Sequence, residues 1–298
     1  MGCDFKITVV AVSVKESNTY IDIAVAEIKR IENLISSWDK NSQTTLINNN
    51  AGVIPVKVDG ELLELIERSI AISKFTDGAF DISFASMDRI WKFDGSVTKM
   101  PSEERVNASV EKVGYENIII NKINSTVFLK KKGMKIGFGG IGKGYAADKA
   151  KELLINSGAS AGIINASGDL TTWGKQANGK PWQVGVTNPL NKDKMFSWFP
   201  IENRAVVTSG NYEKYIMINN KRYSHIINPK TGFPSQGIMS VSVFAPKAEL
   251  ADALATSIFV MGANEGLYFI NQIATVDCII VTDNGKIHYS NNIENEVK

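Results

Sequence analysis

Cysteine and histidine are scarce in this sequence, and their scarcity excludes several kinds of site. Only two Cys and two His occur among the 298 residues. Cys3 and Cys278 lie far apart and without the spacing of metal ligands. Neither a disulfide framework nor a zinc or iron site is therefore expected. Cys278 falls in the apolar run VDCIIV and is predicted to be a core residue.

A charge excess of one sign and long hydrophobic runs are also absent. The 33 Lys and Arg against 31 Asp and Glu leave a net charge of +2, so no overall field attracts nucleic acid. No apolar run reaches the roughly 18 residues that suggest a membrane span. The first residues also lack the pattern of a signal peptide. Two interpretations of the location stay open: a cytoplasmic protein, or one whose export segment is left out of this chain.

What the sequence does contain predicts one folded domain over residues 1–298. A hydrophobic content of 44% can form a substantial core. Strands that often follow one another, with helices interspersed irregularly, favour an α+β fold of mixed sheets over a doubly wound α/β fold. Apolar spacing predicts helices over 19–36, 61–74, 145–157, 250–260 and 265–272, and a polar loop over 38–50. Strands are predicted from residue 5 and near 117–138, 161–165, 182–187, 203–208, 215–219, 238–245 and 276–282.

A glycine-rich segment, GFGGIGKGYAADKA, begins at Gly137 after an apolar run and opens a predicted helix. Such a junction turns backbone N–H groups toward an anion, usually phosphate. The segment fits G-x-G-x-x-G, but positions 155–168 lack the acidic residue of a Rossmann unit. It also fits a P-loop as far as Lys143, but Gly144 stands where a P-loop has Ser or Thr. A phosphate site outside both standard folds is predicted; a loop that only packs a helix on a sheet is the alternative.

Asp252 and Thr256 form a second candidate site. They are four residues apart on a predicted helix, so their oxygens emerge from one face. A carboxylate and a hydroxyl are hard ligands that suit Mg²⁺ or Ca²⁺. A helix-terminal Asp with a Thr bonded to its own backbone explains the spacing equally well.

Histidine supplies the candidate base. His225 precedes the turn-forming run NPKTG, which predicts a rigid loop beside it, and imidazole can take a proton from a hydroxyl nucleophile. A purely structural role is the alternative for His225, and it is the interpretation that we adopt for His288. The segment NASGDL, which begins at Asn165, is typical of a turn. Trp38 and Trp91 could line an aromatic ligand or lie in the core.

In chain order, the segments TDGAFD, GGIGKGYAADKA, NASGDL, TSGNY, YSHIINPKTGFP and ADALATSIFVMG resemble the ApbE family of FAD:protein FMN transferases. The resemblance extends from the first Met-Gly over nearly the whole chain. It implies an ApbE-like fold and Mg²⁺-dependent transfer of the FMN half of FAD to a Ser or Thr hydroxyl of an acceptor protein, with AMP leaving. Hydrolysis of FAD to FMN and AMP, or FAD binding without catalysis, are the alternatives.

The resemblance also implies roles for individual residues. The metal ligands are the carbonyl of Gly140 and the side chains of Asp252 and Thr256, and His225 is the general base. The partners are FAD and an acceptor such as a membrane redox subunit, with no nucleic acid, and the family is usually exported and attached to the membrane. The family usually has Asp where this chain has Gly137. The implied flavin-nucleotide contacts are Met1, Trp38, Ala79, Phe80, Asp81, Lys143, Ile226 and Ala255.

Overall fold

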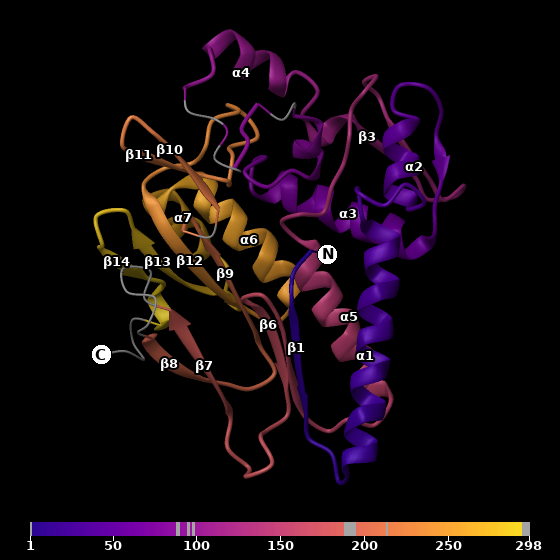
Figure 1. Cartoon of the computed structure of the whole chain (residues 1–298), viewed down its shortest axis with the longest axis vertical. Helices are drawn as coiled ribbons and strands as arrows, with labels where there is room; N and C mark the ends of the chain where they lie inside the picture. Colours follow the sequence, from indigo (N-terminus) through magenta and orange to yellow (C-terminus); the bar gives the residue numbers. More distant parts are fainter. Residues whose placement is uncertain are drawn as a thin grey trace. The chain divides into compact units, whose positions relative to one another are not determined.

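The structure of this chain is a computed structural model that describes residues 2–87, 90–93, 96, 99–187, 195–212 and 214–293. Its contacts group into two compact units, which are described one at a time. The first comprises 1–32, 141–210 and 237–298, and the second comprises 33–140 and 211–236. Helices and strands mix in both (Figure 1), which confirms the predicted α+β class. That residues 1–298 form a single domain stays a prediction.

The first unit is built on a seven-stranded sheet whose neighbouring strands all pair antiparallel. An antiparallel sheet contains no βαβ unit, so the glycine-rich segment is not part of a Rossmann fold. The strands, in spatial order, are β1 (Phe5–Val9), β5 (Gly162–Ala166), β6 (Asp169–Trp173), β9 (Ala205–Gly210), β12 (Ile238–Ala245), β13 (Asp277–Thr282) and β14 (Ile287–Tyr289).

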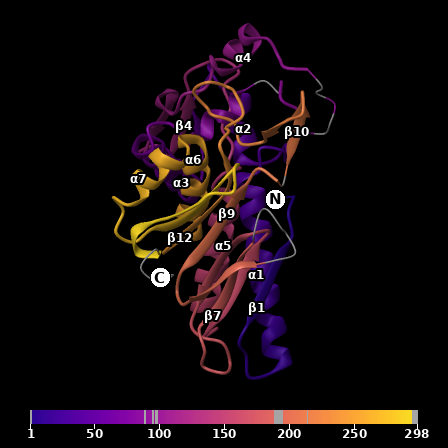
Figure 2. The same ribbon diagram turned by 90° about the vertical axis from the view of Figure 1, so that its left-hand side faces the viewer.

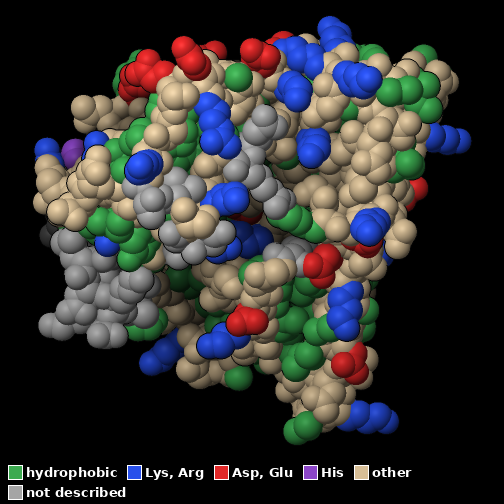
Figure 3. Space-filling view, turned by 45° about the horizontal axis from the view of Figure 1, so that its top comes forward, with side chains coloured by type: hydrophobic (Ala, Val, Ile, Leu, Met, Phe, Trp, Pro, Cys, Tyr) green, Lys and Arg blue, Asp and Glu red, His purple; other side chains and the backbone are tan. Residues whose placement is uncertain are grey.

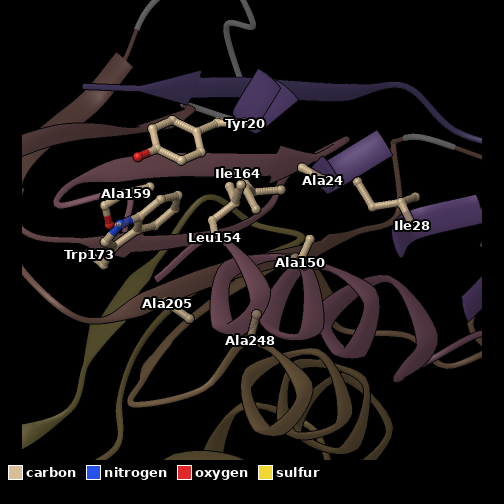
Figure 4. Close-up of a cluster of buried hydrophobic side chains, with 11 residues drawn as sticks. Tyr20, Ala24, Ile28, Ala150, Leu154, Ala159, Ile164, Trp173, Ala205 and Ala248 are labelled. Carbon is tan, nitrogen blue, oxygen red and sulfur yellow. Dashed lines mark hydrogen bonds between the residues drawn. The ribbon is translucent and has the colours of Figure 1, made fainter. Parts of the chain in front are cut away.

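Helices cover one face of this sheet (Figures 1 and 2). They are α1 (Val14–Ile35), α5 (Gly142–Asn156) and α6 (Ala248–Met261), with α7 (Ala263–Ile270) following α6. Side chains from α1 and α5 interlock with those of the sheet to form a core (Figure 4). Its members include Tyr20, Ala24, Ile28, Ala150, Leu154, Ile164, Trp173 and Ala248.

The opposite face is covered by the antiparallel pair β7 (Trp182–Thr187) and β8 (Met195–Ile201). Successive residues of a strand point to opposite faces, so one strand supplies both cores. Thus Ala205 faces the helices, and Val206 faces β7 and β8. The second core contains Leu170, Val184, Val186, Phe199, Ile201, Phe244 and Ile279.

The second unit combines a three-stranded antiparallel sheet, a hairpin and several helices. Its hairpin packs on Trp91, whose indole N–H donates to the carbonyl of Gly232 over 2.7 Å. Trp91 is therefore a core residue and does not line a ligand-binding site. The elements are α2 (Gln43–Asn49), β2 (Val56–Lys57), α3 (Gly60–Phe75), η1 (Ile82–Ser86), α4 (Glu103–Val110), η2 (Tyr115–Asn117), β3 (Ile118–Asn121), β4 (Thr126–Leu129), β10 (Tyr215–Ile218) and β11 (Lys221–Ser224).

Two local predictions are wrong for identifiable reasons. The polar stretch 38–50 contains α2, whose N-terminus is capped by the Ser42 hydroxyl and whose Asn48 side chain bonds both backbone groups of Ile136. These bonds to a distant segment outweigh the turn-forming composition. The predicted strands over 117–138 end at Leu129, and the apolar run before Gly137 is not a strand.

The surface agrees with the near-neutral composition. Basic and acidic side chains both occur across the face shown in Figure 3. Among the described residues, no helix is long and apolar enough to cross a membrane. Cys278 is fully buried, as predicted, and burial raises the pKa of its thiol to about 12.

Candidate active site

The candidate site of the first unit lies beside the contact between the first turns of α5 and α6, which run next to each other (Figure 1). A Cβ at position 144 would lie 2.2 Å from the carbonyl oxygen of Ala248 and 2.8 Å from the amide nitrogen of Glu249. Only glycine allows the first turns of the two helices to approach this closely. The hydroxyl residue of a P-loop is thus excluded from position 144 by backbone packing.

We expect Gly144→Ser to destabilise the protein by about 1–3 kcal/mol, because the backbone of Ala248 cannot move aside without separating the helices. Urea unfolding would measure the change. Gly139→Ser is the matched control, since a Cβ at Gly139 meets nothing within 4 Å. Equal stability of the two variants would contradict the packing argument.

Three charged side chains meet beside this helix contact. The Lys143 ammonium, from the first turn of α5, is bonded to Asp169 and lies 3.9 Å from the Asp252 Oδ1 atom. Asp169 is 1% exposed and Asp252 is 3% exposed. Two buried carboxylates thus face one lysine, and the pKa of Asp169 is raised well above its usual value by burial and then by the charge of Asp252.

Asp169 is the site residue whose role the sequence did not reveal. Its segment is a turn, as predicted: Ser167 and Gly168 have positive φ and close a two-residue hairpin between β5 and β6. Asp169 is the first residue of β6. The turn places its carboxylate where it accepts a hydrogen bond from the Lys143 ammonium. The signal that could have identified it was the position of an acidic residue directly before the strand-like run LTTW.

The structure brings together some of the predicted residues of this unit. Lys143 and Asp252 are in one cluster, and Thr256 follows Asp252 by one turn of α6 and is partly exposed. Ala255 is fully buried. Met1 lies outside the described residues.

The other predicted residues belong to the second unit. The loop after α3 turns at Gly78, with φ of 73°, and buries Ala79, Phe80 and Asp81. Asp81 accepts the amide N–H of Ser83 over 2.7 Å through one oxygen and that of Tyr115 over 2.9 Å through the other. Its carboxylate thus fixes the shape of this loop, while burial raises its pKa.

His225 directly follows β11, and its ring has a defined orientation. Its Nδ1 atom is 3.1 Å from the carbonyl oxygen of Lys214, and Phe93 meets its ring edge-on. A carbonyl oxygen only accepts, so we assign the proton of the neutral ring to Nδ1 and the lone pair to Nε2. The NPKTG loop that follows is closed by the bond from the Gly232 amide to the Asn228 carbonyl, as predicted.

Three more residues of this unit have clear positions. Trp38 is 75% exposed, which is unusual for so large an aromatic side chain. Gly140 directly precedes Ile141, the N-cap residue of α5. A Cβ at Gly137 would lie 3.1 Å from the Ala85 Cβ atom, so the family's Asp would be crowded here.

No group of three or more His, Cys, Asp or Glu side chains that could hold a metal ion occurs among the residues that the structure describes. The predicted metal site is not of that kind, since it combines one carboxylate, one hydroxyl and one carbonyl. Of the described side chains, none donates a hydrogen bond to the buried Asp169 Oδ1 atom. The pair of carboxylates therefore has capacity for a cation in addition to Lys143.

The fold is that of flavin transferases. It superimposes on the ApbE protein of Thermotoga maritima with a TM-score of 0.90 and 31% identity, covering 98% of this chain and 95% of that one. The flavin transferase ApbE from Vibrio cholerae shares the fold with a TM-score of 0.87 at 24% identity, covering 99% of this chain and 96% of that one.

This chain belongs to the ApbE family, which it matches over residues 1–280. A relative from Klebsiella pneumoniae is 29% identical over 87% of this chain and 81% of its own length, and one from Treponema pallidum is 28% identical over 91% and 79%. Both are named FAD:protein FMN transferase. The predicted family, and with it an enzyme of the transferase class, is confirmed.

Proposed function

We propose that this protein transfers the FMN half of FAD to a Ser or Thr hydroxyl of an acceptor protein, in a reaction that depends on Mg²⁺ and releases AMP. The observation that carries the proposal is the cluster of Lys143, Asp169 and Asp252 at the start of α5. It combines a cation, two buried carboxylates and a helix N-terminus within a chain whose relatives are named for this activity.

The donor set of the cluster fits Mg²⁺. This ion takes oxygen ligands, usually one or two carboxylates together with substrate phosphates. Asp252 and Thr256 would hold it, with the carbonyl of Gly140 as a further ligand, and the unsatisfied Asp169 oxygen is consistent with a missing positive charge. Bound there, the ion would neutralise the pyrophosphate and stabilise the leaving AMP.

Lys143 has a separate part in binding. Its side chain, which is 31% exposed, extends from the first turn of α5, where helix N–H groups favour an anion. Contact with a phosphate oxygen would neutralise charge as the bond to AMP breaks. Such transfers depend on alignment and electrostatic stabilisation more than on covalent help from the enzyme.

His225 supplies the base in this scheme. The acceptor hydroxyl loses its proton to Nε2 while its oxygen attacks the phosphorus of the FMN half, and the bond from that phosphorus to the AMP phosphate breaks. The bond from Nδ1 to the Lys214 carbonyl would hold the ring in the tautomer that this step needs. The products are the phosphodiester-linked FMN and AMP.

The remaining predicted contacts would serve the flavin. Exposed Trp38 offers a face on which an aromatic ring could stack. The loop of Ala79, Phe80 and Asp81, whose shape Asp81 fixes, and buried Ile226 beside the base would line its binding site. Contacts from Met1 and Ala255 stay predictions.

Product analysis tests this function. With FAD and Mg²⁺, we expect AMP to form in proportion to the acceptor protein present and no FMN to be released. Chromatography of the small molecules after removal of protein measures both. Equal amounts of FMN and AMP without acceptor would instead identify a pyrophosphatase, and intact FAD throughout would identify a binding protein.

A further inference from the structure

Helices α5 and α6 cap each other. Neither N-cap residue, Ile141 or Lys247, makes a side-chain capping bond. Instead, the amide N–H of Gly144 donates to Asp252 on α6 over 3.2 Å. The amide N–H of Glu249 donates to Asp148 on α5 over 2.9 Å. Each helix thus supplies the carboxylate that satisfies the first turn of the other.

Asp148 is a buried group that the reaction itself does not use. It is 6% exposed, and its Oδ2 atom accepts the amide N–H of Glu249. The charged side chains that face it are Lys151, on its own helix, and Glu249. Burial raises the pKa of Asp148, and the backbone amides of Glu249 and Ala248 oppose that effect. Its contacts go to the backbone of α6.

The two caps set the position of α6 along α5. Asp148 fixes Glu249, in the first turn of α6, and Asp252 lies about one turn further on. Because the backbone of Ala248 already touches Gly144, the helices cannot move closer to compensate for a lost cap. Without the carboxylate of Asp148, the start of α6 would have unsatisfied N–H groups and could shift.

We propose that Asp148 is a positioning residue that holds Asp252 where it binds the divalent cation. The inference rests on the proposed function, because it takes Asp252 as a metal ligand. Asp148 acts through the backbone of α6 and touches neither cation nor substrate. Groups that orient metal ligands in this way typically change metal affinity by about 10–100-fold when they are removed.

Metal binding measured without substrate tests this role. Titration of the apo protein with Mn²⁺, followed by the EPR signal of the unbound ion, would give the affinity. We expect Asp148→Ala to weaken Mn²⁺ binding about tenfold or more. Asp148→Asn should retain most of the affinity, because its amide oxygen still accepts the N–H of Glu249. In turnover, Asp148→Ala should need more Mg²⁺ for half-maximal rate and regain kcat at saturating Mg²⁺.

The matched control is Asp277→Asn. Asp277 is also a buried carboxylate of the first unit, bonded to Arg204 over 2.8 Å, and is not part of the cluster. It should lower stability without changing Mn²⁺ affinity. If Asp148→Ala does not fold, Asp148→Glu, which displaces the same carboxylate, should also weaken Mn²⁺ binding.

Each outcome decides between the two claims. Wild-type Mn²⁺ affinity in Asp148→Ala, or in Asp148→Glu where it replaces that variant, would overturn the positioning role alone. Absence of Mn²⁺ binding by the wild-type protein would contradict the metal assignment and this role with it. Mn²⁺ binding that depends on Asp148, in a protein that transfers no FMN, would support the role and contradict the proposed transfer.

Discussion

Replacing Asp252 by Asn is expected to remove nearly all Mg²⁺-dependent turnover. The amide oxygen can still accept the N–H of Gly144, so the helix contact is retained while the charge that binds the cation is lost. A metal ion contributes several kcal/mol of charge stabilisation, which at 1.36 kcal/mol per factor of ten is at least about a hundredfold in rate. Initial rates of AMP formation across a range of Mg²⁺ concentrations measure the loss.

The Mg²⁺ range separates a ligand from a residue that positions it. Excess Mg²⁺ should not restore the rate of Asp252→Asn, whereas it should restore that of Asp148→Ala. Asp277→Asn, which removes another buried carboxylate, should keep its rate. A rate for Asp252→Asn within a few-fold of wild type would contradict the metal assignment.

The second large effect is expected for His225→Ala. General base catalysis contributes about 10²–10⁴-fold, and the variant should lose a factor in this range from kcat. Stopped assays of AMP release at saturating FAD and acceptor measure the loss.

The second histidine of the chain provides the control for this experiment. His288 lies in β14, paired with Ile280 of the neighbouring strand, and no part of the proposed site includes it. His288→Ala should keep the wild-type rate. Full activity of His225→Ala would remove His225 as the base.

The periodic segments of the fold were predictable from the sequence, and those fixed by distant contacts were not. Helices α1, α3, α5, α6 and α7 were predicted because the apolar residues that each of them buries lie within its own sequence. Helix α2 was missed since its stability comes from the bonds between Asn48 and Ile136, 88 residues apart. The segment around His288, which is strand-like in sequence, forms the short strand β14, but its pairing with β13 is not visible in the local sequence.

The site shows the same division. The spacing of Asp252 and Thr256 was visible because a helix places residues four apart on one face. The meeting of Asp169 with Lys143 was not, since it depends on a hairpin turn and on the pairing of β6 within the sheet. Gly144 broke the P-loop pattern for a reason that only the contact with Ala248 reveals.

The central claim, transfer of FMN to an acceptor protein, is tested most directly by mass spectrometry. The mass of the acceptor is measured after incubation with this enzyme, FAD and Mg²⁺. We predict one covalently attached FMN, mapped by tandem mass spectrometry to a Ser or Thr, and none when Mg²⁺ is chelated or Asp252 is replaced by Asn. An unmodified acceptor in the complete reaction, or the same modification without Mg²⁺, would contradict the account.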